Sequence, residues 1–110
     1  MQGLVIHLLG RPRIELDGEP IAGRLPAKGL AMLCYLAALG TAQPRTTIPS
    51  LLWGALPPRV ARANLRLALT RTGRVLGDAL ETDGATIGFS GRARVTVDLS
   101  GRPNQTNSAC

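Results

Sequence analysis

Four arginines, Arg59, Arg62, Arg66 and Arg74, recur in one segment of the chain at the spacing of an α-helix. At about 100° per residue they project from the same side of such a helix. A guanidinium group is always charged, and its planar fork donates paired hydrogen bonds to a phosphate or to the O6 and N7 atoms of guanine. These residue types at this spacing indicate recognition of a polyanion. The full exposed face comprises Arg59, Arg62, Ala63, Arg66, Thr70, Gly73 and Arg74.

The element that must present these arginines is a long helix over residues 59–76, ended by Gly77. Its opposite face is largely aliphatic, and we expect that face to be buried against the core. The helix contains no acidic residue that could form the i,i+4 ion pairs of a routine surface helix. The expected buried face comprises Ala61, Leu65, Ala68, Leu69, Thr72 and Leu76.

The net charge of +6 is distributed unevenly along the 110 residues. Residues 20–77 contain eight basic side chains and no aspartate or glutamate, whereas the flanking segments are mildly acidic. This distribution is typical of a protein that binds a polyanion such as nucleic acid. A solvated basic face on an ordinary soluble protein is the alternative explanation. Only three residues are aromatic, so the core must be aliphatic.

The beginning of the chain predicts a small antiparallel β-meander. Residues 4–9 are apolar, and residues 13–17 alternate polar and apolar side chains, the period of a strand with one buried face. Asp17-Gly18 indicates a hairpin turn, because both residues tolerate a positive φ. The next strand must be a short edge strand, because Pro20 donates no hydrogen bond.

Two further helices are expected between the meander and the basic helix. The first covers residues 27–39 and ends at Gly40, and its many apolar residues make it central to the core. The second covers residues 47–52, with Thr46 as its N-cap. Pro49 falls in the first turn of that helix, where a missing N–H is tolerated.

The remainder of the chain returns to β structure. Residues 80–82 and 85–90 form a hairpin around Asp83-Gly84, and residues 93–99 form a further strand. The polar segment 100–110 has no periodicity and is expected to be a disordered tail.

This order of elements predicts one α+β domain over residues 1–99. The expected fold is a winged helix-turn-helix with an N-terminal antiparallel β-meander, three helices and a C-terminal β-hairpin wing. In that fold the first two helices support the third helix and present it outward, where it fits the major groove of DNA. The geometry accounts for the third helix being the basic one.

Catalysis, a cofactor and a metal site are not expected. His7 lies in an apolar strand, where a structural role is expected, and neither Cys34 nor Cys110 has the spacing of metal ligands. The sequence has no signal-peptide pattern, and its longest apolar stretch is too short to span a bilayer. We therefore expect a cytoplasmic protein that does not associate with membranes.

Several motifs resemble one family. They are LLGRPRIELDG (8–18), LLWGALPPRVARANLRLAL (51–69), RVLGDALET (74–82) and VDL (97–99). These segments resemble the N-terminal DNA-binding domain of SARP-type (antibiotic regulatory protein) transcriptional activators, whose fold is that of OmpR-type effector domains. The likeness extends over about residues 4–99, and the segment 51–69 is its most specific part.

The resemblance implies sequence-specific binding of double-stranded promoter DNA, as a dimer or tandem pair on direct repeats, and regulation of transcription through RNA polymerase. We expect Arg62 and Arg66 to read bases. The expected recognition-helix contacts are Arg59, Arg62, Ala63, Arg66, Thr70 and Arg74. The expected contacts to the DNA backbone are Arg45, Thr46, Thr47, Arg71, Arg92 and Arg94.

Some features depart from the family pattern. The family usually has a large apolar residue where Thr72 stands and a basic one at Gly73, which should weaken the end of the recognition helix. Asp83 at the wing turn argues against entry of that tip into a minor groove. These 110 residues do not include the bacterial transcriptional activator domain, so we expect an isolated monomer that activates poorly.

Two other functions are compatible with a winged helix. The domain could be a protein-interaction module, for example a truncated regulator that modulates a full-length homologue without activating transcription itself. Such binding should depend little on salt. An RNA-binding winged helix is the third possibility, although the few aromatic residues argue against stacking on single strands.

Overall fold

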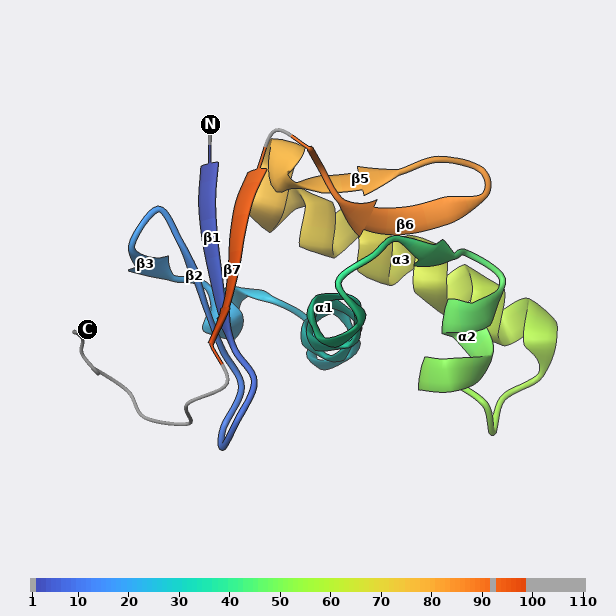
Figure 1. Cartoon of the computed structure of the whole chain (residues 1–110). Helices are drawn as coiled ribbons and strands as arrows, with labels where there is room; N and C mark the ends of the chain where they lie inside the picture. Colours follow the sequence, from blue (N-terminus) through green and yellow to red (C-terminus); the bar gives the residue numbers. More distant parts are fainter. Residues whose placement is uncertain (1, 92, 99–110) are drawn as a thin grey trace.

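The computed structural model of the chain describes residues 2–91 and 93–98 (Figure 1). Within these residues it is an α+β domain with three α-helices and two β-sheets. The first half of the chain contains β1 (Gln2–His7), β2 (Arg13–Leu16), β3 (Glu19–Pro20), the 3₁₀ turn η1 (Ala22–Arg24), α1 (Ala27–Leu39), β4 (Gln43–Pro44) and α2 (Thr47–Leu52). The second half contains α3 (Pro58–Leu76), the 3₁₀ turn η2 (Gly77–Ala79), β5 (Leu80–Thr82), β6 (Thr86–Phe89) and β7 (Ala93–Asp98).

The N-terminal meander is confirmed. Strands β1 and β2 pair antiparallel with Leu4 opposite Leu16, and β2 pairs antiparallel with the two-residue edge strand β3. Asp17 and Gly18 adopt φ values of +52° and +86° at the turn between β2 and β3. The Asp17 carboxylate also accepts a hydrogen bond from the Gly3 amide at 2.8 Å, which ties this turn to β1.

The fourth strand of this sheet comes from the far end of the described chain. β7 pairs parallel to β1, with Leu4 opposite Val95 and Ile6 opposite Val97, so the sheet order is β3-β2-β1-β7. The N-terminal sheet is therefore mixed, where an antiparallel meander alone was expected. Strand β1 begins two residues earlier than predicted and ends at His7 rather than Leu9, because the chain then turns away through Gly10 at φ +74°.

The second sheet has the order β4-β6-β5. Strands β5 and β6 form the predicted hairpin around Asp83-Gly84, with Thr82 opposite Ile87. The two-residue strand β4, which was not predicted, pairs antiparallel with β6. A side chain at Gly88 would approach the Cβ of Ala42 to 2.8 Å, so glycine allows β6 to lie close to the chain leading into β4.

The helix boundaries agree closely with those expected. Gly40, at φ +74°, ends α1 and donates its amide to the Leu36 carbonyl. α2 spans the predicted residues, but Thr46 makes no side-chain hydrogen bond that would cap it. α3 begins one residue earlier than expected, with Pro58 in its first turn, and Gly77 ends it at φ +59°.

The core is aliphatic and gathers around α1. In Figure 1, α1 is seen nearly end-on between the four-stranded sheet and α2. Its buried side chains, Met32, Leu33, Leu36 and Ala37, confirm that this helix is central. The largest side chains that complete the core are Leu4, Ile6, Ile14, Ile21, Ile48, Leu65, Leu76 and Ile87.

Close contact between α1 and α3 fixes how α3 is oriented. Thr72 is fully buried on α3, and its hydroxyl has no hydrogen-bond partner among the described atoms. A Cβ placed on Gly29 of α1 would overlap this hydroxyl. Two small residues, Gly29 and Thr72, therefore meet where the helices pack, and a large side chain at either position would separate them.

We expect Gly29→Ala to lower the free energy of unfolding by about 1–3 kcal/mol, the usual cost of overpacking a close contact. The matched control is Gly73→Ala on α3, because a Cβ there meets nothing within 4 Å. That change should raise the stability by up to about 1 kcal/mol through helix propensity. Urea unfolding of the two variants measures whether each change lowers or raises the free energy of unfolding. Equal stabilisation by both would contradict close α1–α3 packing at Gly29.

Candidate nucleic-acid interface

α3 divides its residues between core and solvent as the sequence predicted. Ala61, Leu65, Ala68, Thr72 and Leu76 are buried and Leu69 is half-buried. On the opposite face Gly73 is half-buried, and the exposed residues are Arg59, Arg62, Ala63, Arg66, Thr70 and Arg74. The guanidinium groups are carried outward because the aliphatic stripe must be covered, and α2 and α1 are the elements that pack most closely against α3.

The arginines of α3 are not neutralised by carboxylates within the described part of the chain. The close contacts of basic side chains with carboxylates found there lie on the four-stranded sheet, where His7 is 3.8 Å from Glu15 and 2.9 Å from Asp98. Thr70 differs from its arginine neighbours, because its hydroxyl donates to the Arg66 carbonyl at 3.0 Å. The Thr70 hydroxyl is therefore available to a ligand mainly as a hydrogen-bond acceptor.

Arg45 joins the entrance of α2 to the β5–β6 hairpin. Its amide donates to the Ala85 carbonyl at 2.8 Å, and its guanidinium donates to the Asp83 carbonyl at 3.5 Å. The side chain is half-buried, whereas the neighbouring Thr46 and Thr47 are exposed. This cation therefore lies beside the hairpin, where its charge adds to the effect of backbone hydrogen bonds in lowering the pKa of the Asp83 carboxyl group.

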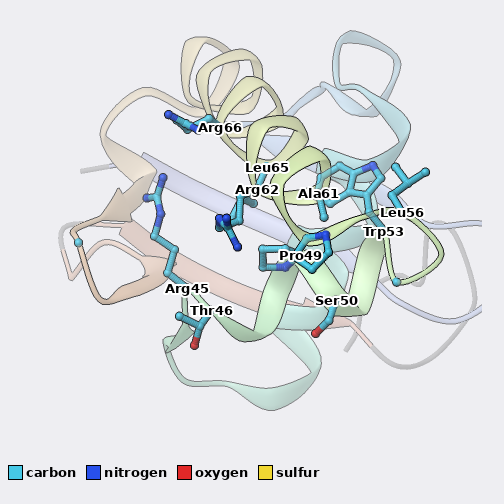
Figure 2. A pocket seen from close by; sticks show the side chains of 13 residues that line it. Arg45, Thr46, Pro49, Ser50, Trp53, Leu56, Ala61, Arg62, Leu65 and Arg66 are labelled. Carbon is cyan, nitrogen blue, oxygen red and sulfur yellow. The ribbon is translucent and has the colours of Figure 1, made fainter.

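A groove of about 500 Å³ brings three of the predicted arginines together. Arg45 enters it from the start of α2, and Arg62 and Arg66 enter it from α3 (Figure 2). In the figure, Arg45 and Arg66 lie at one end of the groove, Trp53 and Leu56 lie at the other, and Arg62 lies between them. The remaining lining residues are Thr46, Pro49, Ser50, Gly54, Pro58, Ala61, Leu65 and Gly84.

Other predicted contacts do not lie in this groove. Arg71 is exposed nine residues after Arg62, so it lies about 180° away on the other flank of α3. Arg94 lies opposite Gly3 in the four-stranded sheet, because β7 joins β1 rather than the hairpin. Arg92 lies outside the described residues.

Sequence patterns gave no indication of part of the groove. Trp53 was expected to close the second helix and to pack against the first and third helices, whereas Leu56 and Ser50 were given no role. The sequence feature that could have indicated the groove is an apolar residue, Leu56, in the connection between α2 and α3. In the structure its side chain is 41% exposed. Convergence of these residues with Arg45 depends on tertiary contacts that local periodicity does not encode.

The hairpin tip is organised by the Asp83 carboxylate. One carboxylate oxygen accepts the backbone amides of Thr86 and Ala85, each at 2.7 Å. The hydrogen bond from the Thr86 amide, and then that from Ala85, hold the pKa of Asp83 below its ordinary value. The carboxylate is thus committed to its own turn, and Gly84 and Ala85 form the exposed tip.

The other reactive side chains are placed away from the groove. The Nδ1 atom of His7 lies 2.9 Å from the Asp98 carboxylate, which links β1 to β7. Burial raises the pKa of the Cys34 thiol on α1. Cys110 lies outside the described residues. Among residues 2–91 and 93–98, no group of three His, Cys, Asp or Glu side chains is placed to hold a metal ion.

We expect Asp83→Ala to speed hydrogen exchange of the Ala85 and Thr86 amides at neutral pH, because both lose their acceptor. In the unchanged protein the pKa of Asp83 is lowered, so its ionised carboxylate stabilises the turn when the pH is above the ordinary pKa range of carboxyl groups. That support is lost only as the pH falls through the lower folded-state value. NMR exchange measurements over an acid titration check this. Glu81→Ala, an exposed acid on β5, is the matched control and should leave both amides protected.

No helix within the described residues is long and apolar enough to cross a lipid bilayer. No protein-family model matches the chain, and no curated protein matches it. The likeness to SARP-type regulators therefore depends on the sequence motifs alone. What distinguishes the candidate site physically is the meeting of three guanidinium groups over an apolar floor.

Proposed function

We propose that the chain is a winged helix-turn-helix domain that binds double-stranded DNA, with α3 as its recognition helix. The order of elements supports this proposal, because two helices precede a long basic helix and a β-hairpin follows it. α2 and α3 are joined by the five residues 53–57, a connection slightly longer than the three- or four-residue turn of most helix-turn-helix motifs.

The observation that carries the proposal is the uncompensated charge on α3. A helix of 19 residues is about 28 Å long, and its diameter matches a major groove about 12 Å wide. Its exposed side carries several guanidinium groups, and no ion pair joins them to carboxylates among residues 2–91 and 93–98. DNA phosphates would supply the missing negative charge and release counterions on binding.

The positions of the arginines suggest separate roles in the complex. Arg62 and Arg66 are central on the exposed face, so we assign them to base edges in the major groove. Arg59 and Arg74 lie nearer the ends of α3 and are assigned to backbone contacts. Arg45, held by the hairpin, would contact a phosphate beside Arg62.

Regulation of transcription is the biological role that fits this binding. The motifs that resemble SARP-type regulators imply promoter sites arranged as direct repeats, contact with RNA polymerase and a cytoplasmic location. We propose that the contribution of this domain to regulation is recognition of the DNA sequence.

A protein contact is a second candidate, favoured by one observation. Val60 and Leu67 are 41% and 50% exposed, and they lie seven residues apart on the same flank of α3. This apolar pair borders the arginine face without belonging to it. It could contact a protein partner such as a full-length regulator, which would give binding with little dependence on salt.

We expect Arg66→Ala to weaken binding to a selected duplex by about 1–3 kcal/mol, because a bidentate base contact is lost. The duplex would first be selected from random DNA by the unchanged domain, and binding would be followed by fluorescence anisotropy. Circular dichroism should remain native, since Arg66 is exposed.

Arg11→Ala serves as the control for loss of charge alone. Arg11 is exposed in the turn between β1 and β2, far along the chain from α3. The Arg11→Ala variant should lose much less affinity for the duplex than the Arg66→Ala variant. Equal affinities for Arg66→Ala and the unchanged domain, with native circular dichroism, would show that α3 does not read the duplex.

A further inference from the structure

The groove contains an apolar floor that DNA binding does not require. Phosphates and base edges need hydrogen-bond donors, which Arg45, Arg62 and Arg66 provide. Trp53 is nevertheless half-buried against the groove, and Leu65, only 2% exposed, forms part of the lining. Apolar surface left in a concave site contributes binding energy only when an apolar group covers it.

The dimensions of the groove match those of sites for small molecules. Such sites usually measure about 300–1,000 Å³ and combine apolar walls with a few convergent polar groups. This groove measures about 500 Å³ and has that composition. Its polar groups are the three arginines, Thr46 and Ser50, and the Ser50 hydroxyl already donates to the Thr47 carbonyl.

Charge selects the kind of molecule that would fit. None of the lining residues is acidic, and three of them carry a positive charge. Arg45 and Arg66 lie at one end, the side chains of Trp53 and Leu56 lie at the other, and Arg62 lies between them (Figure 2). Arg45 also has a long contact of 3.5 Å with the Asp83 carbonyl of the hairpin, which places it at the edge of the groove.

We infer that this groove binds a small organic anion with an apolar body, such as a carboxylic acid bearing a hydrocarbon chain. The carboxylate pairs with Arg45, Arg62 and Arg66. The hydrocarbon covers the floor near Pro49 and extends toward Trp53 and Leu56. Neither an inorganic anion nor an uncharged apolar molecule satisfies both ends of the groove.

A regulatory consequence follows, and it rests on the proposed function. Arg62 and Arg66 are the side chains assigned to base edges, and both line the groove. A bound carboxylate would occupy their guanidinium groups, so the ligand and DNA compete. By linkage, each would lower the affinity of the domain for the other by the same factor.

Octanoate is the probe for direct binding, measured without DNA. Trp53 is the single tryptophan of the chain, so its fluorescence reports on the groove without interference. We expect a saturable blue shift with octanoate, because the hydrocarbon removes water from the indole. Acetate and inorganic phosphate should give no shift, and 1-octanol should bind about tenfold or more weakly because it lacks the charge-assisted contacts.

Two variants and one control locate the site. Arg45→Gln should lower the affinity for octanoate about tenfold, because it removes a charged hydrogen-bond donor. Ser50→Phe should block octanoate binding, because the larger side chain fills the groove. Arg11→Gln removes the same charge outside the groove and should leave affinity unchanged. Circular dichroism of each variant verifies that the fold is retained. Equal octanoate affinity in all three variants would overturn the site.

The outcomes separate the ligand site from DNA binding. A saturable octanoate shift, together with displacement of a labelled duplex, supports both the site and the competition. Octanoate binding without displacement retains the site and overturns the competition. Absence of a saturable shift, or an equal response to phosphate, overturns the ligand site even if DNA binds. Octanoate binding in a domain that binds no duplex overturns the proposed function alone.

Discussion

The packing of α3 on α1 is the constraint on which the rest of the structure depends. Gly29 and Thr72 allow the two helices to approach closely, and this contact fixes the rotation of α3 about its axis. Ala61, Leu65 and Leu76 then face the core, so Arg62 and Arg66 must face solvent. A buried hydroxyl without a partner is normally unfavourable, which indicates that close packing outweighs its cost here.

The same arrangement explains the electrostatics of the interface. Because residues 20–77 contain no acidic residue, folding cannot bring a local carboxylate to the arginines of α3. The hairpin contributes Asp83, whose carboxylate accepts backbone amides of its own turn. Arg45 donates to the Asp83 carbonyl and also interacts electrostatically with this carboxylate, whereas Arg62 and Arg66 have no such neighbour among the described residues. The groove therefore remains cationic at one end, and an external anion is needed to balance it.

The sequence alone was sufficient to predict features that repeat locally. The periodicity of α3, its end at Gly77 and the hairpin turns were predictable because they depend on neighbouring residues. The parallel pairing of β7 with β1 was not, because alternation reveals a strand but not its partner. Arg94 was predicted to contact the DNA backbone, but it lies in the four-stranded sheet opposite Gly3. The groove was also missed, since Arg45 and Trp53 meet α3 only through tertiary packing.

The dependence of DNA binding on salt tests the central claim most directly. Anisotropy of a labelled duplex would be followed from about 50 to 200 mM salt, a range in which counterion release dominates. Each phosphate neutralised contributes about −0.9 to the slope of log K against log salt concentration, so three to five guanidinium contacts predict a slope of about −3 to −5. A slope near zero would contradict the account, because the arginines of α3 would then not be meeting phosphates.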